Sequence, residues 1–508
     1  MSHDVLVALP IVIPLATAVI TLFSYDSRAH QRIISTIGSG ALLVAAIALL
    51  WTVNQDGILV SEMGDWPAPF GIAFVADLLS SLMVLMTGLT ALTVSIYALG
   101  SMDPRRESFG FYPVFQILLM GITGSFLTGD VFNLFVWFEI MLIASFVLIA
   151  LGGERPQLEG SIKYVALNLV SSMILLSAIG LLYGMAGTLN MGDLGLKLQD
   201  VDQPWLVTTV GTLFLVSFGI KAAVFPMFFW LPASYHTPPI AVTAIIAALL
   251  SKVGVYALIR AFTLIFTQET GYTHQIILVI AGLTMVTGVL GAVAQTEVRR
   301  LLSFHIISQI GYMLVGLALL SPLALAGSLF YVIHNMVTKT NLFLISGVAN
   351  RLQGTYELKK LGSLYRYHPY VSVLFFVSAL ALAGMPPFSG FMAKLTLVRG
   401  SLEIEHYVIV AVALLTSMLT LFSMAKIWTE GYWTPSPAEV DGELPPGVEK
   451  FPGWTRQMVA LFIPIIVLAS LSVGMGILAQ PVISLLVDTA EQLLDPGLYI
   501  EAVIGDEP

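Results

Sequence analysis

The sequence predicts an all-α membrane protein with many spanning helices, and three observations support this. Of the 508 residues, 57% are hydrophobic and only 10% are charged, and the mean hydropathy is +0.90. Apolar runs of about 20 residues, the length that crosses a bilayer, recur about fourteen times. Basic residues gather in alternate connections between these runs. A soluble fold of this composition would lack a surface compatible with water, so we exclude one.

The predicted helices follow one another with short connections. The first apolar run has no basic region before it and no small-residue cleavage site after it, so we expect a retained helix. The largest hydrophilic loop, Thr434 to Trp454, is too short for a separate domain, and one membrane domain is expected over residues 1–508. The apolar runs begin near Val5, Ile33, Ala73, Gly110, Asp130, Ile162, Trp205, Pro239, Gln275, Leu301, Ala324, Pro369, Tyr407 and Met458.

Two segments indicate an internal repeat. LFLVSFGIKAAVFPMFFW, residues 213–230, aligns without gaps on LFFVSALALAGMPPFSGF, residues 374–391. Any two apolar helices can match this well, but these belong to helices 7 and 12. Their odd separation makes them cross in opposite directions, as in an inverted repeat. We therefore expect two inverted five-helix repeats, helices 4–8 and 9–13. The expected parts are helices 1–3 over 1–108, the repeats over 109–266 and 274–430, and a last helix over 457–486.

Prolines predict that helices 7 and 12 are broken. Each proline lacks an amide and frees the carbonyl four residues earlier, such as those of Leu382 and Ala383. A free carbonyl is costly in lipid, so a break at this depth indicates a hydrated cavity or a nearby cation. A harmless kink is the alternative, and the nearby Lys221 and Lys394 argue against it. The breaking prolines are Pro226, Pro386 and Pro387.

Lysine is the preferred basic residue inside the predicted spans, and Arg260 is the exception among the arginines. Arginine keeps its proton, whereas a desolvated lysine can release one near neutral pH, so buried lysines indicate proton transfer. Arg260, toward the outer end of helix 8, and Lys426 are both expected to reach the interface by snorkelling. Five of the ten lysines fall inside spans: Lys221, Lys252, Lys339, Lys394 and Lys426.

Only one carboxylate, Glu139, falls near the middle of a predicted span. An unpaired carboxylate there would be destabilising, and we expect it to pair with Lys221. A single carboxylate cannot balance several lysines at once, a mismatch that suits a proton relay. Asp77 and Asp130 lie near helix ends and are interpreted as N-terminal caps or interface residues.

Two histidines, His305 and His334, lie in neighbouring predicted spans close to Lys339. Buried histidines are often simply hydrogen-bonded, but this clustering favours a bridge from Lys252 to Lys394. Haem ligation by the two histidines is an alternative that would leave the buried lysines unexplained. A featureless visible absorption spectrum would exclude it. Because cysteine is absent, any coupled iron–sulfur chemistry would have to lie on another subunit.

Charge predicts the orientation in the membrane. The net charge of -9 gives no reason to expect nucleic-acid binding. The loops rich in lysine and arginine should be cytoplasmic, which places both termini on the outer face, and only Arg399 opposes this. The residues that set the orientation are Arg28, Arg32, Arg105, Arg106, Arg155, Lys163, Arg299, Arg300, Arg351, Lys359, Lys360 and Arg366.

Long motifs spread over nearly the whole chain carry a family resemblance. VWFEIMLIASFVLI, SFGIKAAVFPMFFW, RLLSFHIISQIGYM and LAGMPPFSGFMAKL resemble the antiporter-like subunits shared by respiratory complex I and Mrp-type cation/proton antiporters. Within that family, LPASYHTPPIAVTAIIAALLSKVGVY is similar to the D-type subunit of Mrp complexes. The A-type subunit and the distal complex I subunit usually continue as much longer chains, and here no lateral amphipathic helix is expected.

The resemblance assigns roles to individual residues. It implies a charge pair of Glu139 and Lys221, a central relay lysine at Lys252, and a terminal lysine at Lys394. Some relatives carry histidine where this chain has Gln309, so the resemblance does not define the proton route through helix 10. His305, one turn earlier, is the candidate to take its place.

The resemblance also implies a function. It predicts a subunit of a multisubunit Na⁺/H⁺ antiporter in the bacterial plasma membrane, a transporter rather than an enzyme, with no cofactor and no metal site. The expected partners are the A, B, C, E, F and G subunits, membrane lipid, and protons and Na⁺ as transported ions. Whether Na⁺ enters this subunit is open. The alternatives are a proton-pumping subunit of complex I or of a membrane-bound hydrogenase, and a passive scaffold.

Overall fold

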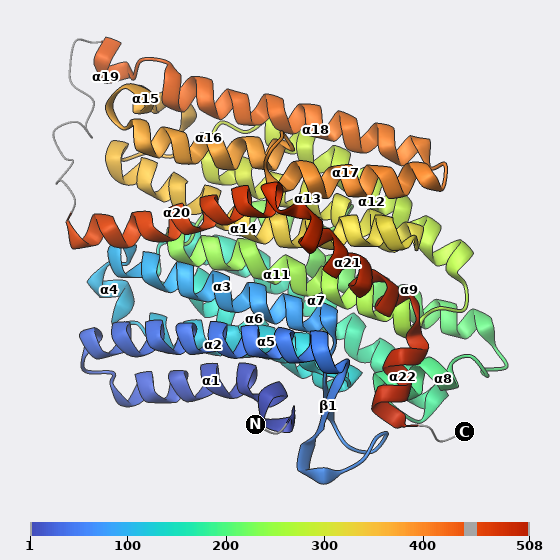
Figure 1. Ribbon diagram of the computed structural model, residues 1–508. Helices are drawn as coiled ribbons and strands as arrows, with labels where there is room; N and C mark the ends of the chain where they lie inside the picture. Colours follow the sequence, from blue (N-terminus) through green and yellow to red (C-terminus); the bar gives the residue numbers. More distant parts are fainter. Residues whose placement is uncertain (1–2, 441–454, 506–508) are drawn as a thin grey trace.

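The computed structural model describes residues 3–440 and 455–505. It confirms the predicted fold class, because the described residues form twenty-two α-helices and one short two-stranded hairpin. Most of the long helices run side by side along one direction, and the hairpin, α8 (Met191–Lys197) and the C-terminus lie together at one end (Figure 1).

The N-terminal part contains a hairpin that the hydropathy pattern does not reveal. We expected the third helix to begin near Ala73, but Ala73–Ala76 is strand β2, which pairs antiparallel with β1 (Leu59–Glu62). The helix begins only at Leu78, because the Asp77 side chain caps it by accepting the amide of Ser80. The helices of this part are α1 (His3–Phe23), α2 (Arg28–Asp56), α3 (Leu78–Ser101) and α4 (Pro104–Glu107).

The middle part surrounds an enclosed helix, α11. Every residue from Ala241 to Arg260 is buried, and only Ile240 at the start of the helix is partly exposed. An apolar helix without a lipid-facing side belongs to the interior of a bundle. The elements are α5 (Phe111–Leu127), α6 (Val131–Ile149), α7 (Arg155–Ala186), α8, α9 (Pro204–Ala222), α10 (Trp230–Ser234), α11 (Ile240–Arg260) and the π-helical turn Ala261–Ile265.

The following part repeats the pattern of long helices around a long, buried one, α14. Its elements are α12 (Thr270–Val293), α13 (Val298–Leu319), α14 (Pro322–Gln353), α15 (Leu364–Tyr367), α16 (Pro369–Ala383), α17 (Ser389–Glu403), α18 (Tyr407–Ile427), the π-helical turn Trp428–Trp433 and α19 (Pro437–Val440). Residues 441–454 of the expected hydrophilic loop lie outside the described residues.

The C-terminal region differs from the expected single helix over 457–486. Helix α20 (Arg456–Ile477) ends at Ile477. Helix α21 (Ala479–Leu494) then starts in a new direction and is followed by α22 (Pro496–Ile504). Leu478 between them is outside helical geometry, with φ -97 and ψ 44. In Figure 1, α21 runs obliquely across the long helices toward the end that carries α22.

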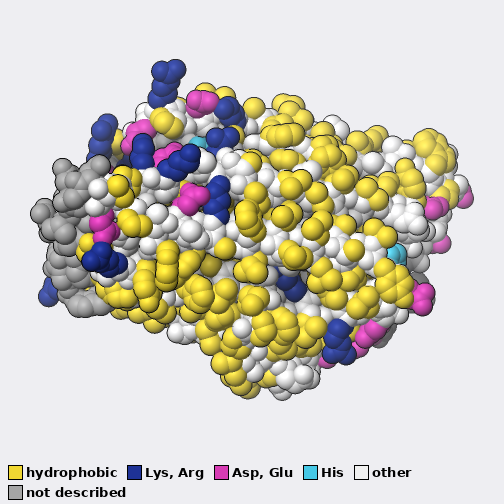
Figure 2. Space-filling model, turned by 90° about the horizontal axis from the view of Figure 1, so that it is seen from above, with side chains coloured by type: hydrophobic (Ala, Val, Ile, Leu, Met, Phe, Trp, Pro, Cys, Tyr) yellow, Lys and Arg dark blue, Asp and Glu magenta, His cyan; other side chains and the backbone are white. Residues whose placement is uncertain are grey.

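Eleven described helices are long and apolar enough to cross a membrane, and α5 and α16 are shorter apolar helices. The count of fourteen spans and the two inverted repeats therefore stay predictions. On the face shown in Figure 2, hydrophobic side chains cover the middle, and most of the visible lysine and arginine side chains gather at the end that bears α4 and α15. This distribution agrees with the charge pattern used to predict the orientation.

Glycines allow the central helices to approach closely. A Cβ atom on Gly254 of α11 would lie 2.5 Å from the backbone nitrogen of Ala222 in α9. A Cβ atom on Gly400 of α17 would lie 2.3 Å from the nitrogen of Ala324 in α14. Small residues at helix crossings let backbones touch in this way. The two contacts place α9 against α11 and α17 against α14.

Candidate functional site

The first helix break follows Lys221. Helix α9 ends at Ala222, Ala223 has a positive φ of 63°, and helical structure resumes at Trp230, so Pro226 lies in the gap. Trp230 Nε1 donates to the oxygen of Ile220 at 2.9 Å. The amide of Phe225 donates to Thr284 Oγ1 of α12 at 3.0 Å. Side chains from other elements thus satisfy backbone groups that the break exposes.

The second break precedes Lys394. Helix α16 ends at Ala383, Gly384 has a φ of 88°, and α17 begins at Ser389, so Pro386 and Pro387 lie between the helices. Lys394 Nζ reaches back and donates to the oxygens of Leu382 at 3.2 Å and Ala383 at 3.0 Å. These are the two carbonyls that the sequence predicted the prolines would free, and a lysine ammonium satisfies both.

The expected pair of Glu139 and Lys221 is joined through a hydroxyl. The Ser172 hydroxyl donates to Glu139 Oε1, and Lys221 Nζ donates to Ser172 Oγ at 3.2 Å. No direct ion pair joins Lys221 to Glu139 within the described ranges. Lys221 is 3% exposed, and its Nζ lies 5.0 Å from the centre of the Phe138 ring. The two charges therefore belong to one cluster, with a side chain of a third helix between them.

A pair of serines holds α7 in register with α9 beside this cluster. Ser171 Oγ donates to the oxygen of Ser217 at 2.8 Å, and Ser217 Oγ donates to the oxygen of Ser171 at 2.9 Å. Ser217 is one helical turn before Lys221 on α9. The reciprocal hydrogen bonds therefore fix the distance between Ser172 and the lysine.

Two further lysines are completely buried, and within the described residues each binds a backbone oxygen only. Lys252 Nζ donates to the oxygen of Ala247 in its own helix at 2.8 Å. Lys339 Nζ donates to the oxygen of Leu302 in α13 at 3.4 Å. Each ammonium carries three donors, so one carbonyl leaves most of its hydrogen-bonding capacity unused. Neither ammonium has a carboxylate partner among the described residues.

Both predicted histidines are buried against serine hydroxyls. His305 Nε2 lies 2.5 Å from Ser423 Oγ, and His334 Nδ1 lies 2.8 Å from Ser389 Oγ. The opposite ring nitrogens have no hydrogen-bond partner in the part of the chain that the structure describes. Buried polar atoms of this kind are normally satisfied by ordered water, so the surroundings suit a hydrated path.

Tyrosines connect the region of Gln309 to Lys394. Tyr331 OH donates to Gln309 Oε1, and Gln309 Nε2 donates to Ser308 Oγ at 2.8 Å. Lys394 Nζ lies 5.0 Å from the ring centre of Tyr312 and 5.8 Å from that of Tyr331. The amide at position 309 is thus part of the polar network, even though it cannot carry a proton as histidine does.

The sequence analysis did not select these hydroxyl groups as site residues, because it chose candidates among side chains that titrate near neutral pH or carry a charge. Serine and tyrosine inside apolar helices were visible in the sequence and would have been the signal. The contacts that use them join helices far apart in the chain. The missed residues are Ser172, Tyr312, Tyr331, Ser389 and Ser423.

Arg260 was also misjudged, since it does not snorkel to the interface. It is 5% exposed and forms an ion pair with Asp77, which is 1% exposed. Its guanidinium carbon lies 5.6 Å from the ring centre of Tyr256 and 4.9 Å from that of Tyr499 in α22. The pair is formed because α3, α11 and the C-terminal helix meet there. Asp77 caps α3 as expected.

Asp130 is a helix cap, as expected, and the snorkelling of Lys426 stays a prediction. Lys426 is half-buried near the end of α18, and its Nζ donates to the oxygens of Val293 and Gln295 at 3.3 and 2.9 Å. Asp130 caps α6 by accepting the amide of Asn133 at 2.7 Å. None of the hydrogen bonds that these two side chains form in the described part of the chain involves a buried lysine.

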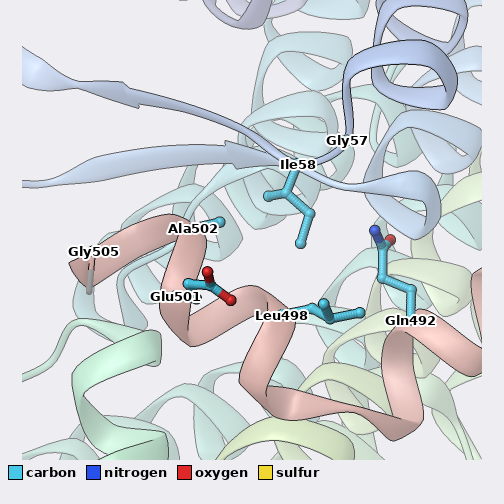
Figure 3. Close-up of a pocket in the computed structure, with 7 residues that line it drawn as sticks. All are labelled: Gly57, Ile58, Gln492, Leu498, Glu501, Ala502 and Gly505. Atoms are coloured by element: carbon cyan, nitrogen blue, oxygen red, sulfur yellow. The ribbon is translucent and has the colours of Figure 1, made fainter. Parts of the chain in front are cut away.

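The cavity in Figure 3 lies apart from all predicted relay residues. It measures about 420 Å³ and separates the end of α2 from α21 and α22. A more polar cavity of about 480 Å³ lies among Arg106, Arg299, Arg351 and other residues near the start of α11. In the described ranges, no three His, Cys, Asp or Glu side chains come together as a metal site would require.

Comparison with known proteins gives consistent results over the full chain. Residues 128–420 match the transmembrane family described as NADH:quinone oxidoreductase/Mrp antiporter. The chain is 43% identical over 501 residues to the D-type subunit of the Na⁺/H⁺ antiporter of Alkalihalophilus pseudofirmus, covering 99% of each protein. It is 39% identical to the protein of the same name in Bacillus subtilis, covering 98% of this chain and 99% of that protein.

The fold has a similar counterpart among solved structures. A chain in the structure of the Mrp complex from a Dietzia species superposes with a TM-score of 0.90 at 33% identity. The match covers 99% of both chains.

Proposed function

We propose, starting from the fact that this chain belongs to the NADH:quinone oxidoreductase/Mrp antiporter transmembrane family, that it is part of a multisubunit Na⁺/H⁺ antiporter. Its role is transport rather than catalysis. The relatives named as D-type antiporter subunits support this assignment, since they match the chain from end to end. The Dietzia counterpart is part of an Mrp complex, which supports assembly with further subunits.

The chain itself carries protons along buried side chains between the two helix breaks. The observation that carries this proposal is the row of buried lysines that bind hydroxyl and carbonyl oxygens rather than carboxylates. A lysine so placed can exist with or without its proton, which a relay requires. The proposed relay residues are the partly exposed Glu139 and the buried Lys221, Lys252, His305, His334, Lys339 and Lys394, with breaks at Pro226, Pro386 and Pro387.

Proton motive force drives cation extrusion through electrostatic coupling to neighbouring subunits, of the A, B, C, E, F and G types. The complex lies in a bacterial plasma membrane with both termini of this chain on the outer face. The clustering of lysine and arginine at the end bearing α4 and α15 supports this orientation (Figure 2).

A second candidate is a proton-pumping subunit of complex I or of a membrane-bound hydrogenase. The description of the matched family, which names both NADH:quinone oxidoreductase and Mrp antiporter, favours keeping it. Both functions use the same buried lysines, but proton motive force drives the antiporter and a redox reaction drives the proton pump. The subunits that copurify with this chain distinguish the two.

The test is Na⁺-dependent proton antiport in everted membrane vesicles that contain the complete complex. We expect Lys221→Ala and Glu139→Ala to abolish antiport while the subunits still copurify. Lys426→Gln is the matched control, because it also removes a membrane lysine but lies outside the row, and it should retain antiport. If Lys221→Ala and Glu139→Ala transport like the native complex, the relay is refuted.

A further inference from the structure

One hydroxyl lies between the acidic and basic members of the first cluster. Ser172 donates to Glu139 and accepts from Lys221, so both hydrogen bonds run in the same sense from lysine to carboxylate. Its side chain is buried, with 5% exposure. A hydroxyl has one donor and two acceptor sites, which is the capacity that this position requires.

We propose that Ser172 is a proton-transferring member of the relay that exchanges a proton between Lys221 and Glu139. This inference rests on the proposed function of the chain. In the forward step the Ser172 O–H bond breaks as its proton bonds to Glu139, and Ser172 Oγ gains a proton from Lys221 Nζ. The ammonium becomes an amine, the carboxylate becomes a carboxylic acid, and the serine is restored. No other reactant is needed, and the reverse step returns both charges.

The surrounding contacts fix the geometry that this transfer requires. The Ser171–Ser217 hydrogen bonds hold the preceding residue of α7 against α9. The Phe138 ring contacts the ammonium of Lys221, and the neighbouring residue in the chain is Glu139 itself. Helices α6, α7 and α9 thus supply the carboxylate, the hydroxyl and the amine from three sides. Without the hydroxyl, the described residues offer no hydrogen-bonded link between the two charges.

A purely structural role is the alternative. Ser172 would then only satisfy hydrogen bonds between helices, as Ser171 does one residue earlier. The two roles differ in what removal of the hydroxyl changes. A structural serine affects assembly and stability, whereas a proton-transferring serine affects the rate and its sensitivity to deuterium.

The experiment uses the intact complex in everted vesicles and compares four serine variants. Ser172→Ala removes the hydroxyl, and Ser172→Thr keeps one. Ser171→Ala removes a hydroxyl at the same α7–α9 contact without touching Lys221. Ser177→Ala removes an exposed hydroxyl of α7 that bonds only to its own helix. Antiport rate, apparent Na⁺ affinity, copurification and the rate ratio in H₂O and D₂O are measured for each.

We expect Ser172→Ala to assemble normally and to lower the maximal antiport rate by about 100-fold, the lower end of the range for loss of a positioned acid–base group. The apparent Na⁺ affinity should stay unchanged, and the solvent isotope effect should rise because proton transfer becomes limiting. Ser172→Thr and Ser177→Ala should transport at close to the native rate. Ser171→Ala weakens the α7–α9 contact, so it should lower the rate less than Ser172→Ala and leave the isotope effect unchanged.

Three results would overturn the inference. Native rates and isotope effects in Ser172→Ala, with antiport abolished in Lys221→Ala, would remove Ser172 from the relay and leave the proposed function standing. Equal losses in Ser171→Ala and Ser172→Ala, with unchanged isotope effects, would assign both serines to packing. Native antiport in Lys221→Ala and Glu139→Ala would refute the proposed function, and the role of Ser172 with it.

Discussion

The two broken helices hold their lysines in different ways. Just before the first break, Lys221 faces a carboxylate through a hydroxyl. At the second break, Lys394 binds the carbonyl oxygens of Leu382 and Ala383 at the C-terminal end of α16. Those carbonyls carry the negative end of the helix dipole, which stabilises a cation without a full negative charge.

The difference has a consequence for charge. When a proton passes from Lys221 to Glu139, both groups become neutral and the net charge of the cluster does not change. When Lys394 loses a proton, its neighbouring carbonyls cannot compensate, and the local charge falls by one. The first cluster is therefore suited to act as an internal switch, and the second to exchange protons with another site. Similar sequence motifs thus produce two electrostatically different sites.

The buried pair of Asp77 and Arg260 is a third case, in which the cation cannot release its proton, because arginine keeps it. We expect its loss to have the largest effect on stability. We expect Asp77→Asn to lower the free energy of unfolding by about 3–5 kcal/mol, since it leaves a buried guanidinium without a carboxylate. Unfolding of the purified complex in mixed detergent micelles measures this. Asp56→Asn, at an exposed helix end, is the control and should be neutral. Equal stability of the two variants would contradict the importance of the ion pair.

At the second break, two substitutions of Lys394 separate hydrogen bonding from proton release. Lys394→Ala leaves buried carbonyls unsatisfied and should cost about 1–3 kcal/mol of stability together with antiport. Lys394→Arg keeps donors for both carbonyls but cannot release a proton, so it should retain stability and lose antiport. Unfolding and vesicle transport of the same preparations provide the comparison. Substantial antiport by Lys394→Arg would show that this position works as a fixed charge.

The smallest expected effects come from the glycines that support each cluster. In Gly254→Ala the added methyl group would clash with the α9 backbone beside Lys221. In Gly400→Ala it would clash with the α14 backbone. Each should cost about 1–2 kcal/mol, within the usual range for overpacking. Only Gly254→Ala should also slow antiport, because it displaces Lys221. Gly474→Ala is the control, since nothing lies within 4 Å of its added Cβ atom. Equal antiport by Gly254→Ala and Gly400→Ala would show that the two clusters tolerate displacement alike.

The sequence by itself determined the properties that depend on local chemistry. Hydropathy identified a helical membrane protein, and prolines placed the gaps after Ala222 and Ala383. The preference for lysine in spans identified Lys221, Lys252, Lys339 and Lys394 as buried, which they are. Each of these conclusions follows from a residue and its neighbours along one helix, so no knowledge of helix packing was needed.

The tertiary structure alone decided which groups these residues meet. Ser172 between Lys221 and Glu139, and Asp77 opposite Arg260, are contacts across 49 and 183 positions of sequence. The hairpin Leu59–Ala76 and the turn at Leu478 likewise depend on what packs beside them. Hydropathy reports whether a side chain leaves water, but the partner that then satisfies its charge or hydrogen bonds is set by the packing of helices distant in sequence.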